Sequence, residues 1–121
     1  MPNTRQQGRS WERAAESLLR RRGLLTLARN YQCRRGEIDL VMLEGTVLVF
    51  VEVRYRRSDR YGSGADSVTL TKQRRIVSAA RQFLGRHAQH AQRPCRFDVV
   101  SIGGGANGAE LDWIRSAFEV S

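Results

Sequence analysis

The segment GEIDLVMLEGTVLVFVEVRYRR, residues 36–57, carries the clearest fold signal of the chain, because it contains two strand-like runs around a turn signal. The first run, residues 36–43, and the second, residues 46–55, are rich in the β-branched and aromatic side chains that favour strands. The second run is apolar without alternation over residues 47–51, which is typical of a central strand covered on both faces. We therefore expect an antiparallel hairpin at the centre of a sheet, with helices on both sides.

The remainder of the chain predicts two helices and three further strands. An apolar stripe with helical spacing in residues 11–19 predicts a helix that starts near Ser10 and closes near Gly23. A second stripe in residues 76–84 predicts a helix with Thr71 as its N-cap. The other strands are expected at residues 24–32, 95–102 and 110–118, with a turn at residues 103–108. The order is α-β-β-β-α-β-β, which indicates an α/β sandwich: a mixed central β-sheet flanked by helices.

Length and charge indicate one small basic domain. The chain has 121 residues, 40% of them apolar, which suits a single core. We expect a flexible N-terminal tail at residues 1–8 and one domain at residues 9–121. No run approaches a membrane span or the apolar part of a signal peptide, so we expect a cytoplasmic protein with no membrane partner. The net charge of +9 favours nucleic acid as the partner, although charge alone does not separate DNA, RNA and acidic membrane.

The hairpin brings two acidic side chains onto one face of the sheet. With Glu44 and Gly45 as a two-residue turn, Asp39 is directly opposite Phe50. Side chains alternate along a strand, so Asp39 and Glu52 become diagonal neighbours on the same face. A slip of one residue in this register would put the two acids on opposite faces.

Like charges beside an apolar strand require a cation or a shared proton. In the same register Glu37 lies directly opposite Glu52, and Arg54 shares their face. Hard oxygen ligands suit Mg²⁺ or Mn²⁺ better than zinc, so we hypothesise a metal ion held by Asp39 and Glu52. The alternative is that Glu37 and Glu52 reach water at the strand ends or pair with some of the many arginines.

Lys72 is the only lysine among the 21 lysines and arginines. It lies in the first turn of the second predicted helix, so its side chain should project toward the sheet. The N–H groups of this helix end could hold a phosphate, with Gln73, Arg74 and Arg75 beside it. A lysine can be tuned to act as a base and an arginine cannot, which would be a chemical reason for a lysine here. The alternative is a solvated lysine among solvated arginines.

A basic segment, RYRRSDRYGSG, follows the strand that carries Glu52. Its polar and glycine-containing composition predicts a loop. Such a loop is typically only solvated, but here it adjoins the acidic pair, which favours a role in gripping a substrate. The side chains concerned are Arg56, Arg57 and Arg60 for phosphates and Tyr55 and Tyr61 for stacking on unpaired bases.

The chain resembles the YraN-like family of small bacterial proteins in a series of motifs. These are GEIDLVML, FVEVRYRR, GSGADSV followed by TKQRRI, and RFDVVSI before a closing aromatic-rich strand, in this order from about residue 9 to residue 118. That family is assigned to the restriction-endonuclease-like superfamily, where it looks most similar to the archaeal Holliday-junction resolvases. The resemblance implies a restriction-endonuclease-like sandwich, a nuclease-like domain over residues 9–121, and branched or single-stranded DNA as substrate. Resolvases act as dimers, so it also implies a homodimer.

The resolvase pattern has an acid on the first helix, an Asp on the second strand, E-x-K on the third strand, and a Gln or Lys on the next helix. By resemblance, Glu12 matches the helix acid, Asp39 the strand acid and Glu52 the acid of E-x-K. Lys72 or Gln73 matches the position on the next helix. This implies a phosphodiesterase in which Asp39 and Glu52 hold Mg²⁺ or Mn²⁺, with Glu12 as a further ligand. A salt bridge to a neighbouring arginine is the alternative for Glu12.

Arg54 departs from the pattern, which expects a lysine at this place. An arginine can grip a phosphate, but it cannot deprotonate the attacking water. Lys72 could supply that function from the helix, which would make Asp39, Glu52, Arg54 and Lys72 the catalytic residues. The alternative is a nucleic-acid-binding protein with weak or lost nuclease activity, because Arg54 replaces the expected lysine.

Overall fold

The structure, a computed structural model, describes residues 4–56, 68–105 and 108–120. Arg57, Arg60 and Tyr61 of the predicted basic loop lie outside the described residues. The predicted α-β-β-β-α-β-β order is confirmed, with a short 3-10 helix, η3, added before the fourth strand. The elements are α1 (Thr4–Arg21), β1 (Leu25–Cys33), β2 (Gly36–Glu44), β3 (Val47–Arg56), α2 (Leu70–Arg86), η3 (Ala88–His90), β4 (Cys95–Gly105) and β5 (Gly108–Phe118).

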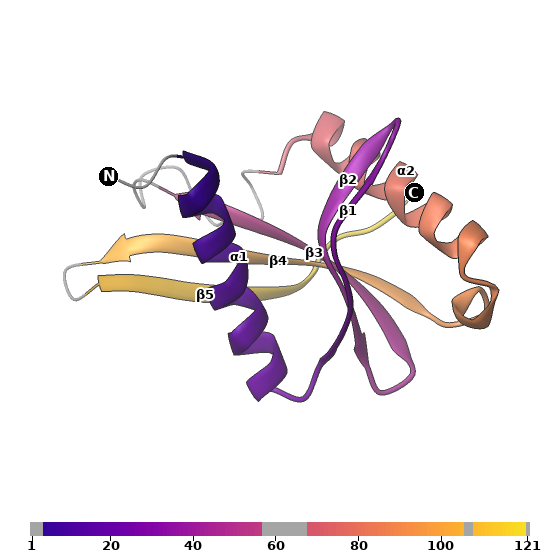
Figure 1. Ribbon diagram of the computed structural model, residues 1–121, viewed down its shortest axis with the longest axis horizontal. Coiled ribbons are helices and arrows are strands. Elements are labelled where there is room, and N and C mark those ends of the chain that lie inside the picture. Colours follow the sequence, from indigo (N-terminus) through magenta and orange to yellow (C-terminus); the bar gives the residue numbers. More distant parts are fainter. Residues whose placement is uncertain (1–3, 57–67, 106–107, 121) are drawn as a thin grey trace.

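The five strands form one mixed sheet in the order β1-β2-β3-β4-β5 (Figure 1). The pairs β1–β2, β2–β3 and β4–β5 are antiparallel, and β3–β4 is parallel. β3 is therefore the central strand, and α2 lies in the crossover that a parallel pair requires. The mixed sheet expected from the sequence is confirmed.

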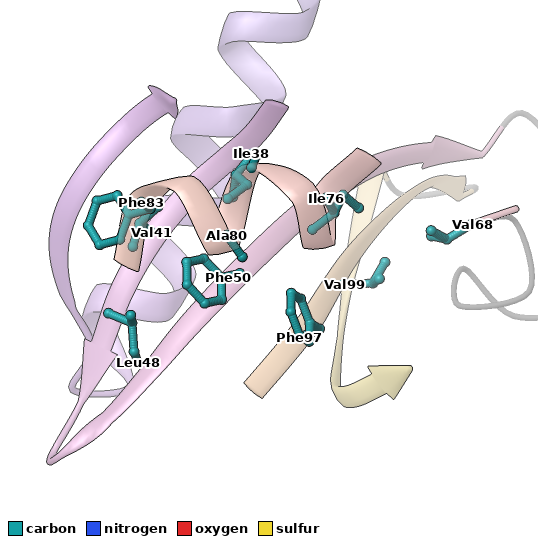
Figure 2. Packing of buried hydrophobic residues seen from close by; sticks show 11 residues of the cluster. Ile38, Val41, Leu48, Phe50, Val68, Ile76, Ala80, Phe83, Phe97 and Val99 are labelled. Carbon is teal, nitrogen blue, oxygen red and sulfur yellow. The ribbon is translucent and has the colours of Figure 1, made fainter. Parts of the chain in front are cut away.

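The two helices cover opposite faces of the sheet. On one face, Ile76, Ala80 and Phe83 of α2 pack against Phe50 and its neighbours (Figure 2). On the other face, Ala15 and Leu19 of α1 pack against a second cluster of buried side chains. Buried residues of β3 alternate between the two clusters, with Leu48 and Phe50 toward α2 and Val49 and Val51 toward α1. The unbroken apolar run in β3 is thus explained, because each side chain of this run meets one of the helices.

Both helices begin earlier than the sequence patterns predict. α1 begins at Thr4, whereas the apolar stripe predicts a start near Ser10 after a tail at residues 1–8. Periodicity cannot detect this extra turn, because it carries no apolar stripe. The predicted cap of α2 at Thr71 is wrong: the helix begins at Leu70, and the Thr69 hydroxyl accepts a hydrogen bond from the Lys72 N–H at 3.2 Å.

The predicted register of β2 and β3 is wrong by two residues. Glu44 pairs with Val47, so the turn consists of Gly45 and Thr46, and Phe50 lies opposite Val41. Gly45 has φ of 60°, the left-handed conformation that tight hairpin turns favour. An even shift leaves every side chain on its predicted face, so Asp39 and Glu52 still share one.

The hairpin of β4 and β5 is longer than expected. β4 continues to Gly105 and β5 begins at Gly108, so glycines predicted for a turn belong to strands. Within the described residues, no helix is long and apolar enough to cross a membrane.

Candidate functional site

The predicted acidic residues meet where β2 and β3 separate. Their ladder ends at the pair of Leu40 and Val51, beyond which the β1–β2 hairpin leaves the rest of the sheet (Figure 1). The next backbone donor, the Val53 N–H, bonds to the Asp39 carboxylate at 2.8 Å. Asp39 thus replaces a backbone partner at the opening between the strands. Burial raises the pKa of Asp39, although the hydrogen bond from Val53 opposes the rise.

Glu52 lies beside Asp39 on the same face, as predicted, and is 4% exposed. Its Oε1 atom is 3.6 Å from Lys72 Nζ and 3.9 Å from Arg54 Nη1. Its Oε2 atom is buried, and no group of the described residues donates a hydrogen bond to it, although the Asp39 carboxyl lies within hydrogen-bond reach of the Glu52 carboxyl. Burial raises the pKa of Glu52 to about 8, and the charge of Asp39 adds to the rise. Glu52 therefore does not reach water, and no donor of the described residues reaches its second oxygen.

Lys72 bridges two carboxylates across the face of the sheet. Its Nζ atom is 3.5 Å from Glu37 Oε1, in addition to its contact with Glu52. The β2–β3 ladder ends at Leu40 and Val51, so the predicted place of Glu37 opposite Glu52 is wrong, and Glu37 pairs with Gln32 of β1. The alternative of a solvated lysine is also wrong, because the ammonium lies against the acidic site.

Gly36, which no sequence pattern singles out, brings α2 close enough for this bridge. A Cβ atom on Gly36 would lie 1.9 Å from the Arg75 carbonyl oxygen in the first turns of α2. Any side chain at this position would therefore push the helix away from the start of β2. A glycine at the start of a strand, where a backbone can approach closely, is the only signal that could have indicated this contact.

Glu12 reaches the same cluster from α1. Burial raises its pKa to about 7, the charge of Asp39 adds to the rise, and a hydrogen bond with the Asn30 side chain opposes it. Asn30 has φ of 51°, a conformation that asparagine tolerates. Within the described residues Glu12 forms no ion pair with an arginine. That role belongs to Glu16, one turn later, whose Oε2 lies 2.7 Å from Arg29 Nη2.

The donor set fits a hard divalent cation. Glu12, Asp39 and Glu52 supply carboxylate oxygens, their pKa values are all raised, and no donor of the described residues bonds to Glu52 Oε2. In the described part of the chain, no group of three acidic, histidine or cysteine side chains already stands close enough to hold a metal ion. The Lys72 ammonium lies against Glu52 instead. Binding a metal ion here would require Lys72 to withdraw and the carboxylates to close together.

The predicted phosphate-binding residues within the described part of the chain lie on two elements, the end of β3 and the start of α2. Arg54 lies on the face of Glu52, while the Arg56 guanidinium lies over Gly103, with Nη2 3.2 Å from the place of a Cβ there. Gln73 donates a hydrogen bond to the Val68 carbonyl oxygen at 3.0 Å and thereby secures the start of α2. Arg74 and Arg75 are exposed on α2.

Asp98 has a structural role. It pairs with Arg96, Nε to Oδ1, at 2.8 Å, and it accepts hydrogen bonds from Trp113 Nε1 at 3.0 Å and from the Ser116 N–H at 2.9 Å. The Ser116 N–H contact explains how Ser116 keeps φ of 50° beside the irregular pairing of β4 and β5. Asp98 therefore holds Arg96, Trp113 and the backbone of Ser116 together.

Comparison with known proteins finds relatives over nearly the whole chain. The family model described as "Uncharacterised protein family UPF0102" matches residues 11–102. This range includes Glu12, Asp39 and Glu52, which together form the acidic cluster. A UPF0102 protein of Stutzerimonas stutzeri (strain A1501) is 48% identical over 119 residues, covering 98% of this chain and 99% of the relative. Another, from Pseudomonas syringae pv. syringae (strain B728a), is 50% identical, covering 97% of each chain. A third, from Xanthomonas euvesicatoria pv. vesicatoria (strain 85-10), is 53% identical, covering 98% of this chain and 96% of the relative.

Proposed function

Because the chain belongs to the UPF0102 family, as its YraN-like motifs predict, we propose that its acidic cluster is the active site of a metal-dependent phosphodiesterase that cuts DNA. The element order around the mixed sheet supports a restriction-endonuclease-like sandwich. The resemblance to resolvases implies an Asp on the second strand and an acid on the third, and Asp39 of β2 and Glu52 of β3 stand in these places. The substrate expected from that resemblance is branched or single-stranded DNA.

The observation that carries this proposal is the buried Oε2 atom of Glu52, to which no group of the described residues donates a hydrogen bond. An unpaired buried acceptor costs roughly 1–3 kcal/mol, and a charged one more. A bound cation would remove that cost, and carboxylate ligands favour Mg²⁺ or Mn²⁺ over softer metals. The adjacency of Asp39 and the approach of Glu12 from α1 supply further oxygens of the same kind.

In this mechanism Asp39 and Glu52 would hold the metal ion, and Glu12 would contribute a further carboxylate oxygen from α1. The metal, when bound, supplies an activated water and stabilises charge on the phosphate. Lys72 leaves Glu37 and Glu52 and contacts the scissile phosphate together with Arg54. Lys72 already acts as a cation toward two carboxylates, and in this mechanism it acts as a cation toward the phosphate as well.

The test is cleavage of labelled DNA substrates in Mg²⁺, Mn²⁺ or EDTA. The panel contains a four-way junction, a flap, a single strand and a duplex, with RNA for comparison. We expect metal-dependent cutting by the wild type and a loss of at least about 100-fold in Asp39→Asn and Glu52→Gln, since even the supporting groups of metal ligands typically contribute 10–100-fold. Glu119→Gln, an exposed carboxylate outside the cluster, is the matched control and should cut normally.

Arg54 favours a second candidate function, a nucleic-acid-binding protein with weak or lost nuclease activity. β3 offers an arginine where the resolvase pattern expects a lysine, and only Lys72 brings an ammonium to Glu52. In that case no substrate is cut in either metal, while salt-sensitive binding of DNA survives Asp39→Asn and Glu52→Gln. Cutting that persists in EDTA would contradict both functions.

A further inference from the structure

The side chains of β1 change faces of the sheet at Asn30. Arg29 faces α1, where its Nη2 atom lies 2.7 Å from Glu16 Oε2. Tyr31 faces α2, where its hydroxyl donates a hydrogen bond to Gln82 Oε1 at 2.8 Å. Residues two apart in a regular strand share a face, but these two are held on opposite faces. Asn30 lies between them with φ of 51°, so its left-handed backbone is what redirects the strand.

β2 changes faces at the same level. The ladder pairs on either side of Asn30 place it directly opposite Asp39, although these two residues are not themselves a ladder pair. Ile38 packs in the cluster beneath α2 (Figure 2), whereas Leu40 packs in the cluster beneath α1. These two residues should again share a face in a regular strand. Asn30 and Asp39 therefore form a kink common to both strands, and the kink takes their side chains out of the usual alternation.

The kink directs the Asn30 side chain to α1, where it meets Glu12. The Glu12 carboxyl lies within hydrogen-bond reach of both the Asn30 side chain and the Asp39 carboxyl. A metal ion needs ionised carboxylates, and then only the Asn30 amide has an N–H to donate to Glu12. Glu12 and Asn30 both line a cavity of about 410 Å³. Without the amide, the Glu12 carboxylate would turn into this open space, away from the like charge of Asp39.

We propose that Asn30 is a positioning residue of the acidic cluster, which holds the Glu12 carboxylate beside Asp39 so that Glu12 can contribute to the metal site. This inference rests on the proposed function, because it concerns the same metal ion. Asparagine combines the two properties that the position needs, since it tolerates a left-handed backbone and carries an N–H donor. Glycine has only the first property, so a glycine variant separates the backbone from the amide.

The experiment measures binding of Mn²⁺ to the full chain by titration calorimetry, without DNA. Asn30→Gly should bind Mn²⁺ about 10-fold more weakly, as loss of a partner that orients a metal ligand typically does. Its urea midpoint should match that of the wild type, because glycine adopts the left-handed conformation without strain. Glu12→Gln should weaken binding at least as much. In the double variant Asn30→Gly should cause no further loss, because the amide acts only through Glu12.

The matched control is Gln32→Ala, which removes an amide from the same strand and the same cavity. Within the described residues the Gln32 side chain forms no hydrogen bond, so this variant should keep the wild-type affinity for Mn²⁺. Wild-type affinity in Asn30→Gly would overturn the inference and leave the metal site standing. Losses that multiply in the double variant would overturn it too, because they would assign Asn30 a merely structural role. A wild type that binds no Mn²⁺ would instead overturn the proposed function, and this inference with it.

Discussion

At neutral pH the Glu52 side chain is divided between its protonated and ionised forms, because its pKa lies near 8. The proton is held by burial and by the neighbouring Asp39 charge, against the opposing effect of Lys72. A metal ion needs the ionised carboxylates, so its binding must release protons from this cluster. The same residue therefore links pH, stability and metal affinity.

Glu52 makes the wild type less stable at high pH relative to Glu52→Gln. Between its ordinary pKa of 4.5 and its raised value of about 8, the folded protein holds a proton that the unfolded chain has lost. This contribution is fully present below 4.5 and is lost as the pH rises through about 8. The measurement is the difference in urea midpoint between the two proteins at about pH 6 and about pH 9. A difference that stays constant would contradict the raised pKa, and adding Mg²⁺ at the higher pH should restore stability to the wild type alone.

Substitutions of Lys72 distinguish two roles for this side chain, a cation that contacts the phosphate and a base that removes a proton. If it acts as a cation, Lys72→Arg should keep DNA cleavage within about 10-fold, while Lys72→Met should lose about 100-fold, because the developing charge on the phosphate loses its partner. The measurement is the single-turnover rate at saturating Mg²⁺. Equal losses in both variants would show that the position needs a removable proton.

The acidic pair could be predicted at the level of residues, and its partners could not. A register shift by an even number of residues keeps each side chain on its face of the sheet. The error of two residues therefore left the prediction that Asp39 and Glu52 share a face unchanged. The contact of Lys72 with Glu37 depends on how closely α2 approaches β2, and sequence spacing carries no information on that distance.

Among the elements, the junction of β2 and α2 tolerates no side chain at Gly36. A Cβ atom there would lie 1.9 Å from the Arg75 carbonyl oxygen, which is backbone and cannot rotate away. We expect Gly36→Ala to destabilise the protein by roughly 1–3 kcal/mol, as overpacking does, and to weaken cleavage by moving Lys72 from the site. Urea unfolding measures the first effect and the DNA assay the second.

The matched control is Gly85→Ala in α2. A Cβ atom on Gly85 would have no atom within 4 Å, and alanine favours a helix over glycine by roughly 0.5–1 kcal/mol. This variant should be as stable as the wild type or more so, with full cleavage. Equal losses in both variants would mean that Gly36 is not a special contact.

The order of the helices and strands could be predicted from the sequence, but the residues at which they begin and end could not. Val68–Arg75 contains two threonines before the apolar stripe of α2, and only the hydrogen bond of Thr69 to the Lys72 N–H identifies the cap. The end of the β2–β3 ladder could not be predicted either. The alternation of side chains continues through Asp39 whether or not the two strands stay paired.

For the whole molecule, the charge of +9 predicts a binding equilibrium that depends strongly on salt. If the site grips about four duplex phosphates, the log–log slope of affinity against salt should be about −3.6. Arg74→Gln with Arg75→Gln should flatten this slope by about 1.8, because two of those contacts are removed. The control is Arg20→Gln with Arg21→Gln, in the last turn of α1. It removes the same charge and should leave the slope nearly unchanged. Affinity that is independent of salt would contradict nucleic-acid binding altogether.

The mixed sheet and its helices on both faces could be predicted from the order of elements and the apolar run in β3, whereas the strand order could be read only from the structure. The parallel partner of β3 could be expected, because a helix separates it from β4. The homodimer implied by the resemblance to resolvases stays a prediction, which sedimentation over a range of concentrations would check.

The parallel pairing of β3 with β4 also dictates the order in which a ribosome can complete the fold. β1, β2, β3 and both helices emerge first and contain every residue of the acidic cluster, but one edge of β3 stays bare until β4 has been synthesised. A bare apolar edge is a template for pairing with another chain. A nascent chain that stalls before residue 95 therefore carries the complete acidic cluster on an aggregation-prone sheet. Only when β4 and β5 have emerged from the ribosome is the edge of β3 covered.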